Sequence, residues 1–114
     1  MKLIYISSPY TVGDIAENVA VQINAAHIIM DWGHAPLAPL LTHFLHMHRQ
    51  RPYEDWMKVD LEALVPKSDI ILRLPGESKG ADREVKKAEE LGIPVVYGWY
   101  CLREFLKILN PLPQ

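Results

Sequence analysis

Short apolar runs alternate with helical segments along this chain, and that alternation constrains the fold more than any other feature. The clearest apolar run is residues 69–74, which ends abruptly at Pro75 and Gly76. We predict further strands at residues 3–7, 34–39 and 93–97, and the second of these should be short because prolines interrupt it. We predict helices at residues 14–32, 40–48, 54–65, 80–91 and 100–109.

Strands that are separated by helices favour a parallel sheet with helices on both faces. The predicted fold class is therefore α/β, a doubly wound sheet of the flavodoxin-like or Rossmann-like kind. A chain of 114 residues with 49% hydrophobic residues suits a single domain, residues 1–114, with one core. Ligands bind beyond the carboxyl ends of the strands in such sheets, so a site is expected where residues 3–7 and 69–74 end.

The ends and the apolar spacing of two helices predict further details. Asp14 can cap the first helix and Gly33 can end it. The helix at residues 54–65 should end before Pro66, because proline disrupts a helix interior. The expected apolar stripe of the first helix consists of Ile15, Val19, Ile23, Ala26 and Met30.

Composition and charge exclude several classes of protein. The formal net charge of -2 gives no basic footprint for duplex nucleic acid, so we expect no nucleic-acid partner. No apolar run approaches the roughly 18 residues of a membrane span, and no signal segment is evident, so we expect a soluble, cytoplasmic protein without a membrane partner. The lone Cys101 cannot form an intramolecular disulfide, and its aromatic neighbours predict a core thiol.

An acidic residue lies within the apolar stripe of the helix at residues 80–91. Ala81, Val85, Ala88 and Leu91 follow the helical repeat, and Glu84 falls inside their stripe on a wheel of roughly 100° per residue. A charged group that faces a core destabilises the fold unless it is paired or has a function. Glu84 is therefore either a reactive carboxylate or a buried structural hydrogen-bond acceptor.

A second acidic residue repeats this pattern in the helix at residues 54–65. Asp60 lies between Trp56 and Leu64 on the apolar side of the wheel. Two inward-facing acids on separate helices are suited to acid/base or nucleophilic chemistry, because their environments can keep one ionised and the other protonated. The alternative for Asp60 is a partly exposed acid in a capped loop.

The strand-to-helix turn before Glu84 is typical of an anion site. The free amides and the positive dipole end of the helix favour an anion near Ser78 and Gly80. Ser78 adds a hydroxyl donor, and Lys79 adds a positive charge. Many α/β proteins have such a turn without a ligand, so the turn alone leaves phosphate binding open.

Taken in order, the motifs of the chain resemble those of the nucleoside 2-deoxyribosyltransferase superfamily, which includes 2′-deoxynucleoside 5′-phosphate N-hydrolases. The resemblance runs through most of the chain. It rests on Tyr5-Ile6-Ser7-Ser8-Pro9-Tyr10, Gly33-His34-Ala35-Pro36, Asp60-Leu61-Glu62-Ala63-Leu64 with Ser68-Asp69-Ile70, Ser78-x-Gly80-x-x-x-Glu84 and Gly92-Ile93-Pro94-Val95.

The resemblance implies a role for each matching residue. Glu84 matches the nucleophilic glutamate, which attacks C1′ of the sugar and displaces the base. Asp60 matches the acid that supports protonation of the departing base, and Tyr5 matches a tyrosine that holds the glutamate by its hydroxyl. Ser78 matches a serine that contacts a 5′-phosphate. The chemistry parallels that of retaining glycosidases and needs no cofactor and no metal.

Further substrate-binding candidates are Ser8, Tyr10 and Thr11 after the first strand, together with Gly80 and His43. The nucleotide hydrolases have an arginine in the first loop, where this chain has Tyr10 or Thr11. The substrate is therefore a nucleoside or a nucleoside 5′-monophosphate. Resolution of the intermediate by water or by a second base decides between hydrolase and transferase.

Alternative functions remain at this point. A phosphoribohydrolase loop, Pro-Gly-Gly-x-Gly-Thr-x-x-Glu, is only partly similar to residues 75–84. A non-catalytic nucleotide-sensing module would keep the anion turn and would not require Glu84. The histidines at residues 43, 46 and 48 lack a recognisable ligand motif, so we predict no metal site. Family resemblance, the apolar segment 40–48 and the terminal apolar residues 106–109 predict a homodimer, with residues 40–56 at or near its interface and lining the neighbouring pocket.

Overall fold

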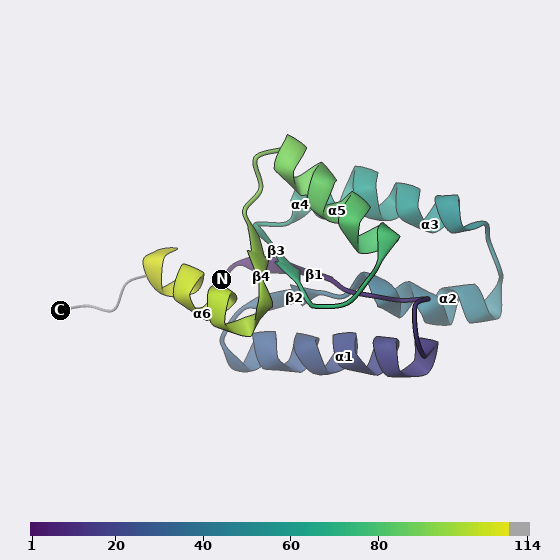
Figure 1. Ribbon diagram of the computed structural model, residues 1–114, viewed down its shortest axis with the longest axis horizontal. Helices are drawn as coiled ribbons and strands as arrows, with labels where there is room; N and C mark the ends of the chain where they lie inside the picture. The colour runs from purple at the N-terminus through teal and green to yellow at the C-terminus, as the bar shows by residue number, and fades with distance from the viewer. Residues whose placement is uncertain (110–114) are drawn as a thin grey trace.

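The computed structural model describes residues 1–109, which form a four-stranded parallel sheet with helices on both faces (Figure 1). The strands are β1 (Leu3–Ser7), β2 (Ala35–Leu37), β3 (Ile70–Arg73) and β4 (Val95–Tyr97), in the spatial order β2-β1-β3-β4. The predicted α/β class and parallel sheet are confirmed. β2 is only three residues long, as the two prolines of residues 34–39 predict.

Residue parity along the central strands decides which helices cover each face of the sheet. Ile4 and Ile70 are register partners and pack, with other even-numbered residues, against α1 (Ile15–Asp31) and α6 (Gly98–Leu109). Tyr5 and Ile71 point the other way, toward α4 (Val65–Lys67) and α5 (Lys79–Glu90). Figure 1 shows these two helix layers on opposite sides of the sheet.

α1 begins and ends as predicted but turns a different face to the sheet. Asp14 caps it by accepting a hydrogen bond from the Glu17 amide at 3.1 Å. Ile15 and Met30 of the predicted stripe are 39% and 60% exposed. The helix has apolar residues on more than one side, and packing against the sheet selects among them. The buried residues are Val19, Gln22, Ala25 and Ile29.

The two predicted helices between β2 and β3 are broken into shorter pieces. The first consists of a 3₁₀ turn, Pro39–Leu41, followed by α2 (Thr42–His48). The second consists of α3 (Tyr53–Val59), a π-helical turn η2 (Asp60–Leu64) and α4, so the predicted end before Pro66 is wrong. Pro66 lies in the first turn of α4, where its missing N–H is tolerated.

Two apolar side chains that we predicted to be buried lie at the surface. Cys101 is exposed, so its assignment as a core thiol is wrong. Its neighbour Leu102 is the buried residue of α6, and adjacent positions point roughly 100° apart on a helix. Leu91 is 48% exposed because it lies at the C-cap of α5, beyond the packed face. Within residues 1–109, no helix has the length and apolar character needed to cross a membrane.

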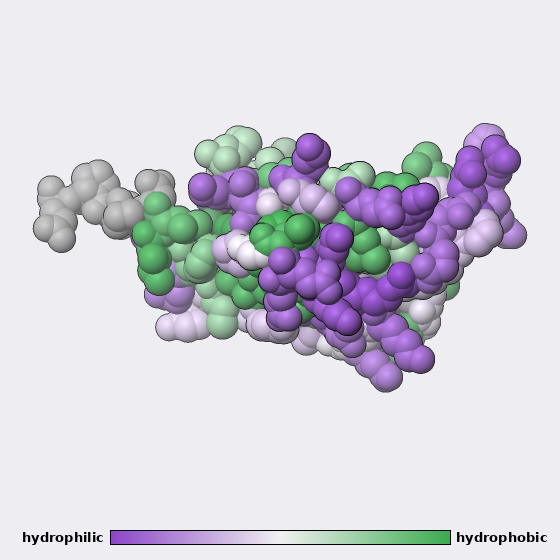
Figure 2. All heavy atoms as spheres, turned by 90° about the horizontal axis from the view of Figure 1, so that it is seen from above, coloured by the Kyte–Doolittle hydropathy of each residue, from purple (hydrophilic) through white to green (hydrophobic). Residues whose placement is uncertain are grey.

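α5 is strongly amphipathic, and this sets the direction of Glu84. Its buried residues include Ala81, Glu84 and Ala88, whereas its remaining side chains are mostly charged and exposed. Figure 2 shows hydrophilic side chains over this side of the molecule. Ser78 caps the helix through a 3.0 Å hydrogen bond from the Ala81 amide to its Oγ.

Candidate active site

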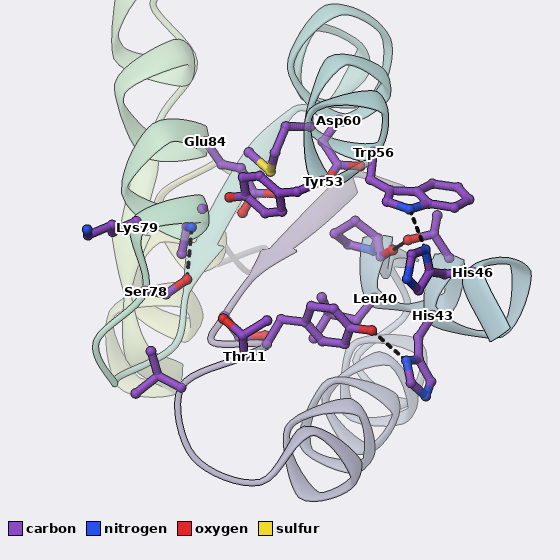
Figure 3. Close-up of a pocket in the computed structure, with 18 of the residues that line it drawn as sticks. Thr11, Leu40, His43, His46, Tyr53, Trp56, Asp60, Ser78, Lys79 and Glu84 are labelled. Carbon is purple, nitrogen blue, oxygen red and sulfur yellow. Dashed lines mark hydrogen bonds between the residues drawn. The ribbon is translucent and has the colours of Figure 1, made fainter. Parts of the chain in front are cut away.

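A cavity of about 510 Å³ lies at the carboxyl ends of β1 and β3 (Figure 3). The loop after β1, the segment Pro39–His46, α3 and the start of α5 surround it. This is the place that the parallel sheet predicts for a ligand. Eight of the residues that we predicted for the site line the cavity: Ser8, Tyr10, Thr11, His43, Asp60, Ser78, Gly80 and Glu84.

Glu84 is buried at one wall of the cavity and held by two hydroxyl groups from β1. Its side chain is 5% exposed. Tyr5 donates a hydrogen bond to Oε2, and Ser7 donates one to Oε1 at 2.9 Å. Both donors lie on the odd-numbered face of β1, and neither lines the cavity. Their hydrogen bonds fix the orientation of the carboxylate and favour its ionised form.

The pKa of Glu84 reflects opposing effects. Burial raises it, the hydrogen bonds from Tyr5 and Ser7 and the positive charge of Arg73 lower it, and the resulting pKa is about 7. Burial, followed by the charge of Glu84, raises the pKa of Tyr5 well above its usual range, so Tyr5 remains a neutral donor. Glu84 can therefore ionise near neutral pH in an environment with little water.

Asp60 projects into the same cavity from the π turn between α3 and α4 (Figure 3). Its side chain is 8% exposed, and Oδ1 has no hydrogen-bond partner among the described residues. Burial, followed by the charge of Glu84, raises the pKa of Asp60 to about 8. Of these two carboxyl groups, only Glu84 has hydroxyl donors among residues 1–109, so we place the carboxylate on Glu84 and the proton on Asp60 at neutral pH.

The start of α5 closes one end of the cavity and comes unusually near to α3. A Cβ atom at Gly80 would lie 2.9 Å from the hydroxyl oxygen of Tyr53, so a side chain here would require Tyr53 to move. At the surface, Arg83 of α5 donates two hydrogen bonds to the carboxylate of Glu54 of α3. Nη1 lies 2.8 Å from Oε1, and Nη2 lies 3.0 Å from Oε2. The oxygen of Ser78 already accepts the capping hydrogen bond, which leaves its O–H available to donate.

The opposite wall carries two histidines, each with an aromatic partner. The hydroxyl of Tyr10 lies 2.5 Å from Nδ1 of His43. Nδ1 of His46 accepts hydrogen bonds from the Trp56 indole at 2.9 Å and from the Arg51 amide at 3.2 Å. Because both of these groups can only donate, the neutral His46 must carry its proton on Nε2. Among residues 1–109, no group of three or more metal-ligating side chains is placed to hold an ion.

Comparison with known proteins places the chain in a family. Residues 2–98 match the model of DUF7768, which is described as a domain of unknown function. The chain belongs to this family. No protein among the curated sequences matches it.

A solved structure is similar to this DUF7768 domain. It comes from a study of the 2-deoxyribosyltransferase of the psychrotolerant bacterium Bacillus psychrosaccharolyticus. The two chains are 25% identical and superpose with a TM-score of 0.64, over 83% of this chain and 70% of the other. The similarity supports the resemblance to the deoxyribosyltransferase superfamily, without selecting a subfamily.

Several residues of the DUF7768 site were not predicted from the sequence. Ser7 shares the strand face of Tyr5, so strict alternation along β1 gave a usable signal for it. Arg73 is a charged residue in an otherwise apolar strand, and this pattern could also have identified it as a candidate. Its guanidinium donates to the Leu74 carbonyl and, at 2.8 Å, to the Gly76 carbonyl. No sequence signal indicated the cavity-lining residues Arg51 and Tyr53.

Gln22 is a further unpredicted residue, and it joins two walls of the cavity. It is 1% exposed within the sheet-facing side of α1. Its amide nitrogen donates to the Ile6 carbonyl at 3.0 Å and to Ser8 Oγ at 2.9 Å, and its oxygen accepts from the Leu40 amide at 2.7 Å. Gln22 therefore fixes the end of β1 relative to the 3₁₀ turn.

Proposed function

We propose that this protein cleaves the N-glycosidic bond of nucleosides or nucleoside 5′-monophosphates, with Glu84 as nucleophile and Asp60 as assisting acid. One observation carries the proposal: two buried carboxyl groups share a cavity, and their pKa values are ordered as the two roles require. The similarity to a 2-deoxyribosyltransferase supports an enzyme that acts on nucleosides.

In the first step, a carboxylate oxygen of Glu84 attacks C1′ as the bond from C1′ to the base breaks. The electrons of that bond leave with the base, and the carboxyl of Asp60 gives its proton to the departing nitrogen. The product is an ester between Glu84 and the sugar. The hydroxyl groups of Tyr5 and Ser7 hold the attacking carboxylate in place.

In the second step, water or another base attacks C1′ and the ester bond breaks. Asp60, now ionised, accepts the proton of the attacking group, and Glu84 returns to its carboxylate form. Two displacements at C1′ retain the configuration of the sugar. In this proposal Ser8, Tyr10, Thr11 and His43 contact the nucleoside, and Ser78 and Gly80 contact its 5′ end.

The experiment that tests this proposal is a screen for free base. The wild-type protein is incubated with nucleosides and with nucleoside 5′-monophosphates, and the products are separated by chromatography. A second base added to each reaction distinguishes a transferase, which forms a new nucleoside, from a hydrolase. Binding of these compounds without release of base from any of them would refute the proposal and favour a nucleotide-sensing module.

The apolar surface of α2 supports a further part of the proposal, a homodimer. α2 has no buried residue, although it contains several apolar side chains. Phe44, Leu45 and Met47 are each more than half exposed. Exposed apolar side chains in one short segment are typical of a protein interface. We propose that a second copy of the chain covers this segment, beside the mouth of the cavity.

A further inference from the structure

The turn η2 contains one residue more than an α-helical turn, and this changes which side chains share a face. The amide of Val65 donates to the carbonyl of Asp60, five residues earlier. The buried side chains on this stretch are Met57, Asp60, Val65 and Ser68. Side chains five residues apart diverge by about 140° on a regular α-helix. Only the wide turn allows Asp60 and Val65 to point in similar directions.

A regular helix would place a different residue toward the cavity. Val65 is fully buried against Tyr5 and Ile71 and therefore fixes the C-terminal part of the stretch. With Val65 fixed, the position four residues earlier would share its face, and that position is Leu61. An apolar Leu61 would be buried there at lower cost than a carboxyl group. In a regular helix that keeps Val65 in the core, burial of Leu61 would therefore be favoured over burial of Asp60.

Pro66 accounts for the wide turn. A proline at this position has no N–H to donate to the carbonyl of Glu62, and its ring would collide with that carbonyl in a regular α-helix. The π turn separates these groups and places Pro66 in the first turn of α4. Pro66 itself is exposed, so its side chain adds nothing to the core.

We propose that Pro66 is a positioning residue for Asp60: it imposes the π turn that aims this carboxyl into the cavity beside Glu84 while Val65 stays in the core. This inference rests on the proposed function, in which Asp60 is the assisting acid. It assigns a task to a surface residue that touches no substrate.

The test is the substitution Pro66→Ala, with Pro94→Ala as the control. Pro94 is an exposed proline outside the helices. The titration of the Asp60 carboxyl is followed by ¹³C NMR, which needs no enzymatic activity. In Pro66→Ala we expect Asp60 to titrate near the ordinary value of about 4 and base release to fall by roughly 10² to 10⁴, as for loss of a general acid. Pro94→Ala should match the wild type in both measurements.

A rescue variant separates positioning from a general loss of structure. Deletion of the exposed Ala63 from Pro66→Ala leaves Asp60 and Val65 four residues apart, which is in phase on an α-helix. This variant should recover the raised Asp60 pKa and most of the base release. Recovery would not be expected if Pro66→Ala merely disrupted the fold.

The outcomes distinguish this inference from the proposed function. An Asp60 titration that is unchanged in Pro66→Ala, or a deletion variant that recovers neither measurement, would overturn the positioning role. If the wild type released no base but the Asp60 pKa still fell in Pro66→Ala, the positioning role would stand and the proposed function would fail.

Discussion

At the scale of single residues, Glu84 and Asp60 are similar carboxyl groups with different surroundings. Both are buried, and burial raises the pKa of each. Only Glu84 has hydroxyl donors, from Tyr5 and Ser7, and only Asp60 has a buried oxygen without a partner among the described residues. Hydrogen-bond donors favour an ionised carboxyl, so the proton of the pair belongs on Asp60.

We predict that Glu84→Ala and Glu84→Gln abolish base release. Glutamine keeps the shape and the position of the side chain but is a very poor nucleophile. Measurement of free base over time, together with circular dichroism to show that each variant is folded, checks this prediction. A folded Glu84→Ala protein with the wild-type rate would exclude a glycosyl-glutamate intermediate.

We predict that Asp60→Asn lowers turnover by roughly 10² to 10⁴, the usual range for general acid catalysis. The asparagine cannot give a proton to the departing base. The loss should be smaller for nucleosides whose leaving base is already activated, because such a base needs less protonation. Rates measured on a series of leaving bases check this. An equal loss on all of them would indicate that Asp60 orients the sugar instead.

At the scale of elements, the cavity depends on how α3 approaches the start of α5. The Tyr53 hydroxyl occupies the space that a Cβ of Gly80 would need, and Arg83 of α5 pairs with Glu54 of α3. The ion pair lies at the surface, where solvent screens such pairs and they contribute little stability. The close packing at Gly80 is therefore the more specific of the two contacts.

We predict that Gly80→Ala impairs substrate binding with little loss of stability, and that adding Tyr53→Phe restores binding. Alanine is favoured over glycine in a helix by up to about 1 kcal/mol. This gain offsets the free-energy cost of moving the Tyr53 side chain. Phenylalanine lacks the hydroxyl that a Cβ would meet at 2.9 Å. KM and the melting temperature of both single variants and of the double variant check this. Independent, additive effects would show that the contact does not shape the site.

At the scale of the whole molecule, the carboxyl pair should make stability depend on pH. Folded pKa values of about 7 for Glu84 and 8 for Asp60 exceed the ordinary value of about 4. Between about pH 4 and pH 8, the folded state then binds more protons than the unfolded state. The contribution of this pair to the stability of the fold is therefore largest at low pH. This contribution is lost as the pH rises through about 7 and 8.

We predict that the free energy of unfolding falls by about 4 kcal/mol between pH 6 and pH 8.5. The double variant Asp60→Asn, Glu84→Gln should lose most of this dependence, because neither side chain titrates. Urea unfolding of both proteins at the two pH values checks this. A wild type as stable at pH 8.5 as at pH 6 would show that the two pKa values are not raised.

We also predict that the protein sediments as a dimer at micromolar concentration. In the proposed dimer, the exposed apolar residues of α2 form the contact between the two copies. Phe44→Glu should shift the equilibrium toward the monomer, because it introduces a charge into the apolar contact. Val21→Glu on α1, a substitution of another exposed apolar residue, is the control. A fully active wild-type monomer would contradict the prediction.

The sequence by itself determined the fold class and predicted that the two acids, Glu84 and Asp60, face inward. Strand runs, helix caps and the periodic placement of Glu84 are local patterns, formed by residues close together in the chain. The prediction of α1 failed at the level of packing, because this helix has apolar residues on more than one side and only the sheet selects between them. Local patterns also predicted that a helix ends before Pro66. A π turn instead precedes this proline, and the helix continues through it as α4.

Only the tertiary structure decided which side chains meet. The strand order β2-β1-β3-β4 brings Tyr5 and Ser7 of the first strand beneath Glu84, far away in sequence. Burial and the mutual charge of Glu84 and Asp60, which set their pKa values, arise only when α3, the π turn and α5 converge on one cavity. Such distances depend on crossovers and on packing between remote segments, and no periodicity within a segment encodes them.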